Sequence, residues 1–187
     1  MKSGAKKIIM CVNELSYSGV PVYTKNLCQL LKEYEFCIWS LSDGEYRREF
    51  EKLGIPVEII NDIQQVKEKI ENCGETYAAC MIHSAYSYQL YEAISAYLPT
   101  VWYIHEGKLL QYLCNLWEEL RILLRNALNI VCVSEYAADI VKVVSGNNGV
   151  KVINNIAFVA EGAESPKETP DFTPPRKQNS VRAAWNN

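Results

Sequence analysis

Short apolar runs alternate with segments of helical periodicity along most of this 187-residue chain. The first run, residues 8–12, is apolar and partly β-branched, which is typical of a strand that is buried on both faces. A polar turn follows, and apolar residues then recur at helical spacing from Tyr23 to Leu31, with Ser18 as the expected N-cap. A strand, a turn and a helix in this order form the repeating unit of a parallel sheet.

The same unit recurs along the chain, and the spacing predicts an α/β fold. Strands alternating with helices imply right-handed crossovers and a doubly wound, largely parallel, Rossmann-like sheet with helices on both faces. The expected strands cover residues 8–12, 36–41, 57–60, 77–82, 100–104, 129–133 and 150–153. The first expected helix begins after Ser18, and the others cover residues 46–53, 62–72, 86–97, 108–127 and 135–145.

The alternation stops near residue 157. Four of the seven prolines lie beyond this point, among Glu, Lys, Thr and Ser, and no periodic apolar face is visible there. This composition is typical of a linker. We therefore expect one domain, residues 1–156, and a proline-rich linker or tail, residues 157–187, that ends before a second domain forms.

Charge and cysteine content exclude several classes of protein. A net charge of -3 gives no basic footprint for a phosphate backbone, so we expect no nucleic-acid partner. The seven cysteines include no C-x-x-C pair and are interpreted as reduced core residues. No apolar run approaches the ~18 residues of a membrane span, so a soluble intracellular protein is predicted.

The turn after the first strand is the first candidate site, because ligands of open parallel sheets bind outside the carboxyl ends of the strands. Ser18 and Gly19 could present backbone N–H groups at a helix N-terminus to an anionic group. A dinucleotide fingerprint needs three spaced glycines, however, and this turn has one. The alternative interpretation is a capped turn that uses Gly19 for backbone freedom.

The only two histidines of the chain also follow predicted strands. His83 ends one strand, and His105, with Glu106 beside it, ends the next. Both imidazoles should lie at the same edge of the sheet, where they could bond a hydroxyl or act as acid or base. The alternatives are that each is a hydrogen-bonded structural residue, or that both bind a metal. No third ligand is spaced to join them, so no metal is predicted.

Two further features have both structural and functional interpretations. Ser134 and Glu135 suit the start of a helix as N-cap and first-turn charge, but they also face the expected crevice. The apolar stripe from Leu110 to Leu124, flanked by Lys108 and arginines, could be an amphipathic membrane-facing surface. Packing against the sheet or a partner domain is the favoured interpretation.

An ordered set of segments resembles a known family. The set consists of KKIIMCVNELSYSGVPVYTKNLCQLL, GIPV, MIHSAY, VWYIHE, NIVCVSEYAADIV and VKVINNI, and it spans residues 6–156. Together these segments resemble the N-terminal domain of a family 4 glycosyltransferase with the GT-B architecture, in which two Rossmann-like domains face each other across a cleft. The sequence departs from the family in keeping one glycine in the first loop and Asn154-Asn155 in place of a Pro-Asn-Gly stretch.

The resemblance implies transfer of a sugar from a nucleotide-sugar donor to a glycan or lipid-linked acceptor, usually with retention and without a metal or other cofactor. It implies that His105 contacts the donor sugar, that His83 lies near the acceptor pocket and that Gly19 approaches the donor phosphates. We therefore expect His105 as the catalytic residue. The expected substrate-binding residues are Ser18, Gly19, His83, Glu106, Ser134 and Glu135.

The family's C-terminal domain, which holds the nucleotide and stabilises the departing diphosphate, has no counterpart in these residues. The resemblance thus implies an acceptor-side domain that is inactive without its C-terminal half. It would act in polysaccharide or glycolipid assembly in the cytoplasm, with peripheral contact at the inner face of the membrane. The alternatives are a non-catalytic α/β module that pairs with a separate subunit and, less favoured, a flavodoxin-like nucleotide or flavin binder.

Overall fold

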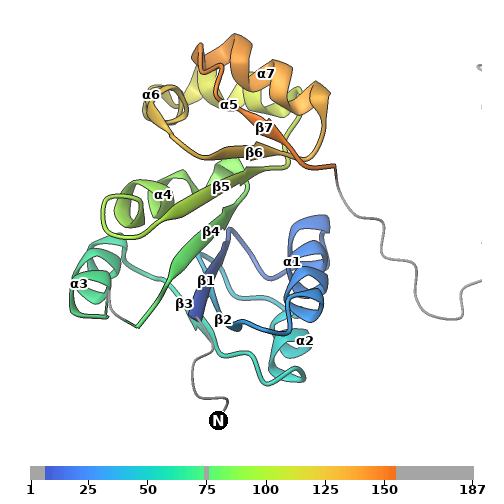
Figure 1. Cartoon of the computed structure of the whole chain (residues 1–187), viewed down its shortest axis with the longest axis vertical. Coiled ribbons are helices and arrows are strands. Elements are labelled where there is room, and N and C mark those ends of the chain that lie inside the picture. The colour runs from blue at the N-terminus through green and yellow to red at the C-terminus, as the bar shows by residue number, and fades with distance from the viewer. Residues whose placement is uncertain (1–6, 74–75, 155–187) are drawn as a thin grey trace, which may run out of the picture. The chain divides into compact units, whose positions relative to one another are not determined.

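Seven parallel strands form a single sheet in residues 7–73 and 76–154, the residues that this computed structural model describes (Figure 1). Their order is β3-β2-β1-β4-β5-β6-β7, so the direction of winding reverses between β1 and β4. This arrangement confirms the predicted doubly wound α/β fold. The strands are β1 (Lys7–Val12), β2 (Glu35–Ser40), β3 (Val57–Ile59), β4 (Ala79–His83), β5 (Thr100–Ile104), β6 (Ile130–Cys132) and β7 (Lys151–Val152).

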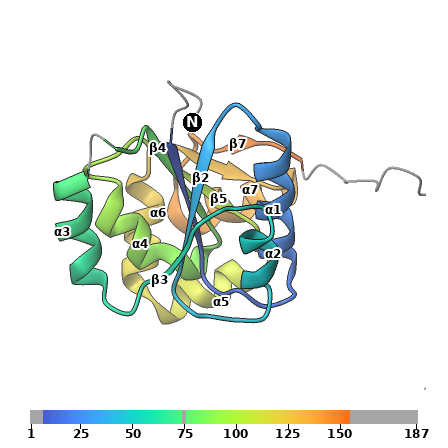
Figure 2. The same ribbon diagram turned by 90° about the horizontal axis from the view of Figure 1, so that it is seen from below.

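Helices cover both faces of the sheet, and each face has its own core. Successive residues of β1 point to opposite sides, so Ile9 packs into one apolar cluster and Met10 into the other. One cluster lies under α1 (Gly19–Leu30) and α2 (Arg47–Glu51). The other lies under α3 (Ile63–Cys73), α4 (Tyr88–Ile94), α5 (Leu109–Leu116), α6 (Glu118–Asn126) and α7 (Glu135–Ser145). Figure 2 shows α1 and α2 on one side of the sheet and α3 and α4 on the other.

The single helix predicted for residues 108–127 is wrong, because the chain forms two helices that meet at Trp117. This residue has extended backbone angles, φ -123° and ψ 96°. Its indole packs against Tyr86 and Tyr88, with ring centroids 5.8 and 5.5 Å apart. A contact between distant segments therefore overrides local helix propensity. Glu118 and its acidic neighbour then begin α6, where negative charge is favourable.

The apolar stripe of these two helices is core. Leu110, Leu113, Leu120 and Leu124 are all buried in the larger cluster, which confirms packing against the sheet as the favoured interpretation. Within the described residues, no helix combines the length and the apolar character that crossing a membrane requires.

The helix predicted for residues 86–97 also differs from the observed one. It begins with a 3-10 turn, η1 (Ala85–Ser87), and α4 then ends at Ile94. A tight turn follows, in which the backbone N–H of Tyr97 donates to the carbonyl of Ile94 at 2.9 Å. Pro99 keeps the helix from resuming before β5, because a proline disfavours helical backbone in the residue before it, here Leu98.

The cysteines with described side chains number six, and all are buried and free. Burial raises the pKa of Cys28 and of Cys132 to about 12, which makes these thiols unreactive. The interpretation as reduced core residues is thus confirmed for those six. The side chain of Cys73 and the predicted linker, residues 157–187, lie outside the described part of the chain.

Gly44 joins the loops that follow β1 and β2, and we expect its substitution to destabilise the fold. A Cβ atom at Gly44 would lie 2.2 Å from the carbonyl oxygen of Leu15, which also accepts the backbone N–H of Tyr46 at 2.9 Å. Because the clashing atom is backbone, Gly44→Ala should lower the free energy of unfolding by about 1–3 kcal/mol in urea titrations. Gly19→Ala is the matched control, since a Cβ there meets no atom within 4 Å. Equal unfolding midpoints for the two variants would contradict this account.

Candidate functional site

The two histidines meet at the carboxyl edge of the sheet, beside the point where the winding reverses. The parallel register pairs His83, the last residue of β4, with Tyr103 of β5. His105 follows β5 directly, and its Nε2 lies 3.1 Å from Nδ1 of His83. His83 is fully buried and His105 is partly exposed. The structure thus brings together the two residues that the sequence placed at one edge.

Two tyrosines complete an aromatic cluster around the histidines. Tyr23 of α1 stacks on Tyr103, with ring centroids 5.4 Å apart and planes inclined by 10°. The hydroxyl of Tyr23 donates to that of Tyr103 at 3.2 Å, and Tyr103 donates to the carbonyl of Ile153 at 2.9 Å. Both phenol rings meet His105 edge to face, at centroid distances of 5.5 and 4.9 Å. The apolar spacing of the sequence predicts Tyr23 on a helix stripe but contains no signal for this contact.

Burial keeps both imidazoles neutral at pH 7. Desolvation lowers the pKa of His105 to about 4. Desolvation, reinforced by repulsion from His105, holds the pKa of His83 well below its usual value. A neutral imidazole has one N–H donor and one lone pair, so the pair can exchange hydrogen bonds with a hydroxyl without introducing positive charge.

Glu106 ties the ends of β4 and β5 together. Its carboxylate accepts the backbone N–H groups of Ala85 at 3.0 Å and of His105 at 3.1 Å, and it also accepts the hydroxyl of Ser84. The predicted role of Glu106 was to bind substrate. In the structure its oxygens bond the chain itself and fix the loop that carries His105.

Ser84 holds a strained backbone conformation next to His83. Its angles are φ 74° and ψ 144°, and it is the one residue other than glycine with positive φ in the described part of the chain. Its N–H donates to the carbonyl of Tyr103 at 2.9 Å, and its carbonyl accepts Nε1–H of Trp102 at 3.1 Å. Such strain persists where surrounding contacts enforce it, and it clusters at functional sites.

The first turn of α1 leaves open space beside Gly19. Ser18 occupies the N-cap position as predicted, but its side chain makes no capping hydrogen bond. Gly19 does not have a left-handed φ, and a Cβ there would meet no atom. The fold itself therefore does not require glycine at this position. Tyr23, one turn further along α1, contacts both histidine rings.

The start of α7 lies against the loop that follows His105. Ser134 is the predicted N-cap, and its hydroxyl oxygen accepts the backbone N–H of Ala137 at 3.2 Å. Glu135 is exposed in the first turn. A Cβ atom at Gly107 would lie 2.7 Å from the ring of Tyr136, so the two segments pack closely.

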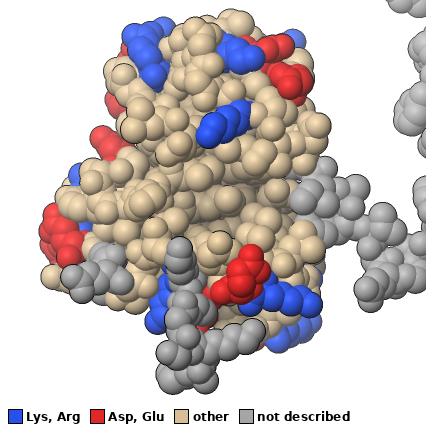
Figure 3. All heavy atoms as spheres, viewed as in Figure 1, with Lys and Arg blue, Asp and Glu red and all other residues tan. Residues whose placement is uncertain are grey.

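A charged hollow of about 840 Å³ lies beside the loops that follow β1 and β2. Tyr17 and Arg48 line it, together with the ion pairs of Arg47 with Asp43 and Glu51. Figure 3 shows acidic and basic side chains gathered over the lower part of the molecule near α2, whereas the middle of this face carries little charge. No sequence motif indicates this hollow, because its charges are dispersed along an ordinary helix and loop.

Comparisons of the sequence with known proteins find no matching family model and no curated protein that matches. Among the residues that the structure describes, no group of three or more His, Cys, Asp or Glu side chains could hold a metal ion.

Comparisons of the fold find solved structures of about twice the length. Anabaena Alr3699/HepE in complex with UDP-glucose superposes with a TM-score of 0.62 at 18% identity, covering 80% of this chain and 43% of that one. A glycosyltransferase from Rickettsia africae ESF-5 superposes with a TM-score of 0.58 at 16% identity, covering 81% and 43%. The present chain thus has the fold of one part of these larger proteins and spans less than half of their length.

The histidines should make stability depend on pH. Unfolding returns each imidazole to a pKa near 6.5, whereas the folded values are lower, so the unfolded state binds more protons below that pH. The stabilisation is fully present above pH 6.5 and is lost as pH falls toward 4. We expect urea unfolding at pH 7, 6 and 5 to show a loss of up to about 1.4 kcal/mol per pH unit per histidine. A variant with His83→Asn and His105→Gln should flatten this slope, and an unchanged slope would contradict the assignment.

Substitutions at Ser84 should separate strain from hydrogen bonding. Ser84→Ala and Ser84→Gly both remove the hydroxyl that bonds Glu106, but only glycine adopts φ 74° without steric cost. We expect the alanine variant to be less stable than the glycine variant by about 1 kcal/mol in urea unfolding. The reverse order of stability would show that the backbone at Ser84 is not strained.

Proposed function

We propose that this chain is the acceptor-side domain of a glycosyltransferase of the family 4, GT-B type, which transfers a sugar from a nucleotide-sugar donor to a glycan or glycolipid hydroxyl. The observation that carries the proposal is the neutral His83–His105 pair at the edge of the sheet where ligands of such folds bind. The similarity in fold to a structure solved with UDP-glucose supports it. A second Rossmann-like domain, in the same chain or a separate one, would hold the nucleotide.

His105 suits a role in binding the donor sugar. A pKa of about 4 makes it a weak base at neutral pH, so hydrogen bonding to a sugar hydroxyl suits it better than removing a proton. Because its ring packs edge to face against Tyr23 and Tyr103, the direction of that hydrogen bond is fixed before the substrate binds.

The segments around the histidines would complete the donor and acceptor sites. The N-terminus of α1 at Ser18 and Gly19 offers backbone N–H groups and the positive end of a helix dipole to the donor phosphates. Ser134 and Glu135 would line the same cleft from α7. The hollow beside α2, with Arg48 on its wall, would receive a polar acceptor.

A second candidate function is a non-catalytic module that pairs with a separate subunit. The outward face of α5 favours it, because Leu109, Tyr112 and Leu116 are 46%, 61% and 56% exposed. A partner that covered this face would bury all three side chains. Lys108 begins the same helix, and this face is also where we would place peripheral contact with the cytoplasmic side of a membrane.

Turnover by the complete protein tests the proposal. This chain, joined to its second domain or mixed with the subunit that supplies it, should release nucleotide from UDP-glucose or another nucleotide sugar when an acceptor is present. Residues 1–187 alone should not. His105→Ala should reduce turnover by about 10²-fold or more.

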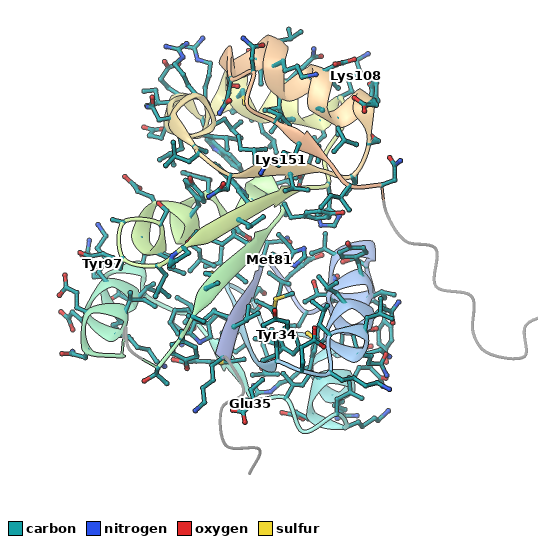
Figure 4. All side chains as sticks on the ribbon, in the orientation of Figure 1. Tyr34, Glu35, Met81, Tyr97, Lys108 and Lys151 are labelled. Atoms are coloured by element: carbon teal, nitrogen blue, oxygen red, sulfur yellow. The ribbon has the colours of Figure 1, made fainter. Side chains whose placement is uncertain are left out.

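Tyr97→Phe is the control for this experiment. Tyr97 precedes β5 and Lys108 follows it, and Figure 4 shows the two residues on opposite sides of the molecule, so Tyr97 lies far from the histidine edge. Unchanged turnover in His105→Ala would remove His105 from the active site. A complete protein that turns over no nucleotide sugar, but binds its partner through α5, would favour the non-catalytic module.

A further inference from the structure

Two nitrogens of the histidine pair have no hydrogen-bond partner among the described residues. Nδ1 of His83 bonds Nε2 of His105, but Nε2 of His83 is buried without a hydrogen-bond partner in the described part of the chain. Nδ1 of His105 also bonds no described residue, and it is not among the fully buried atoms. The pair thus has a buried unpaired nitrogen at His83 and a less buried one at His105.

Two arrangements of the protons satisfy this geometry. Each neutral imidazole carries one N–H, and one proton must lie between the rings. If His83 donates from Nδ1, its buried Nε2 is a bare lone pair and His105 carries its own proton on the less buried Nδ1. If His105 donates from Nε2, a buried N–H of His83 has no acceptor, and Nδ1 of His105 is a bare lone pair.

The buried Nε2 of His83 decides between the two arrangements. Among backbone groups, a buried N–H without an acceptor is rarer than a carbonyl that lacks a donor, and the same order applied to the imidazole favours a bare Nε2 at His83. We therefore propose that His83 is a positioning residue that fixes the tautomer of His105, so that Nδ1 of His105 presents a proton to an oxygen of the sugar substrate. This inference deepens the proposed function and rests on it for the identity of the substrate.

The surroundings allow little rotation of either ring. His83 ends β4 and is fully buried, with the rings of Tyr23 and Tyr103 edge to face at centroid distances of 6.0 and 5.7 Å. Glu106 holds the backbone N–H of His105. A ring flip at His105 would break the contact with His83, so the proton on Nδ1 stays directed away from the pair.

Neutrality of both rings is required for this arrangement. Burial lowers the pKa of both histidines, as described above, and the closest carboxylate, Glu106, is occupied by two backbone N–H groups and the Ser84 hydroxyl. Burial also raises the pKa of the Tyr103 phenol, which therefore remains uncharged at neutral pH. In the described contacts of the pair, Glu106 bonds the backbone N–H of His105 and not its ring, so none of these contacts brings a charged group to the shared proton.

Nitrogen NMR of the 187-residue chain tests the tautomer directly. Because the chain has only two histidines, labelling with ¹⁵N-histidine yields four ring-nitrogen signals. Correlation to the ring protons at pH 7 should show both His83 and His105 protonated on Nδ1 and bare on Nε2. A proton on Nε2 of His105 would overturn the proposal without any need for a variant.

Two substitutions of His83 test whether it controls His105. Asparagine places an amide N–H close to the position of Nδ1, so His83→Asn should keep His105 protonated on Nδ1. His83→Leu fills a similar volume without a donor, and His105 should then lose its preference for Nδ1–H. Dispersed backbone amide spectra confirm folding of each variant. An unchanged His105 tautomer in His83→Leu would show that His83 has no positioning role.

Kinetics of the complete protein separate this inference from the proposed function. His83→Leu should lower kcat about 10-fold to 100-fold below that of His83→Asn, the range found when an orienting partner of a metal-bound histidine is lost. Turnover with His105 protonated on Nε2 would refute the positioning role alone. The expected tautomers with no turnover of any nucleotide sugar would refute the proposed function and leave the control of His105 by His83 intact.

Discussion

The carboxylate of Glu106 is the interaction on which the rest of the edge depends. It bonds the residues that follow β4 and those that follow β5, so the two strand ends are tied together by one side chain. Together with the bonds of Ser84 to Tyr103 and Trp102, these bonds support the positive φ of Ser84 and the 3.1 Å approach of His83 to His105. Hydrogen bonds from backbone N–H groups to a charged carboxylate are stronger than those to a neutral acceptor. Such bonds are suited to a contact that offsets backbone strain.

The location of this contact follows from the winding of the sheet. The order in which the strands are added reverses between β1 and β4, so α1 leaves the edge on one side of the sheet and the segments after β4 and β5 leave it on the other. Tyr23 of α1 stacks on Tyr103 of β5 at this edge. The histidines are thus enclosed by elements from both faces, which accounts for their desolvation and their low pKa values.

Most of the fold was predictable from the sequence because its signals are local. Each of the seven strands is a short apolar run between turn residues, and parallel winding then places His83 and His105 at one edge without further information. The break at Trp117 was not predictable, because Tyr86 and Tyr88 cause it from a distant segment. The same reason applies to the partners of Glu106 and to the strain at Ser84, since serine has no local preference for positive φ.

The neutral imidazoles limit what this domain could contribute to sugar transfer. Sugar transfer from a nucleotide donor leaves a diphosphate whose negative charge must be stabilised in the transition state. Two uncharged imidazoles can orient hydroxyl groups but cannot balance that charge, and the N-terminus of α1 supplies at most about half a positive charge. In the proposed function, the basic groups that stabilise the diphosphate therefore belong to the second domain. In the same proposal, the domain described here would orient the sugar and the acceptor, and a polar centre built from hydrogen bonds suits that task.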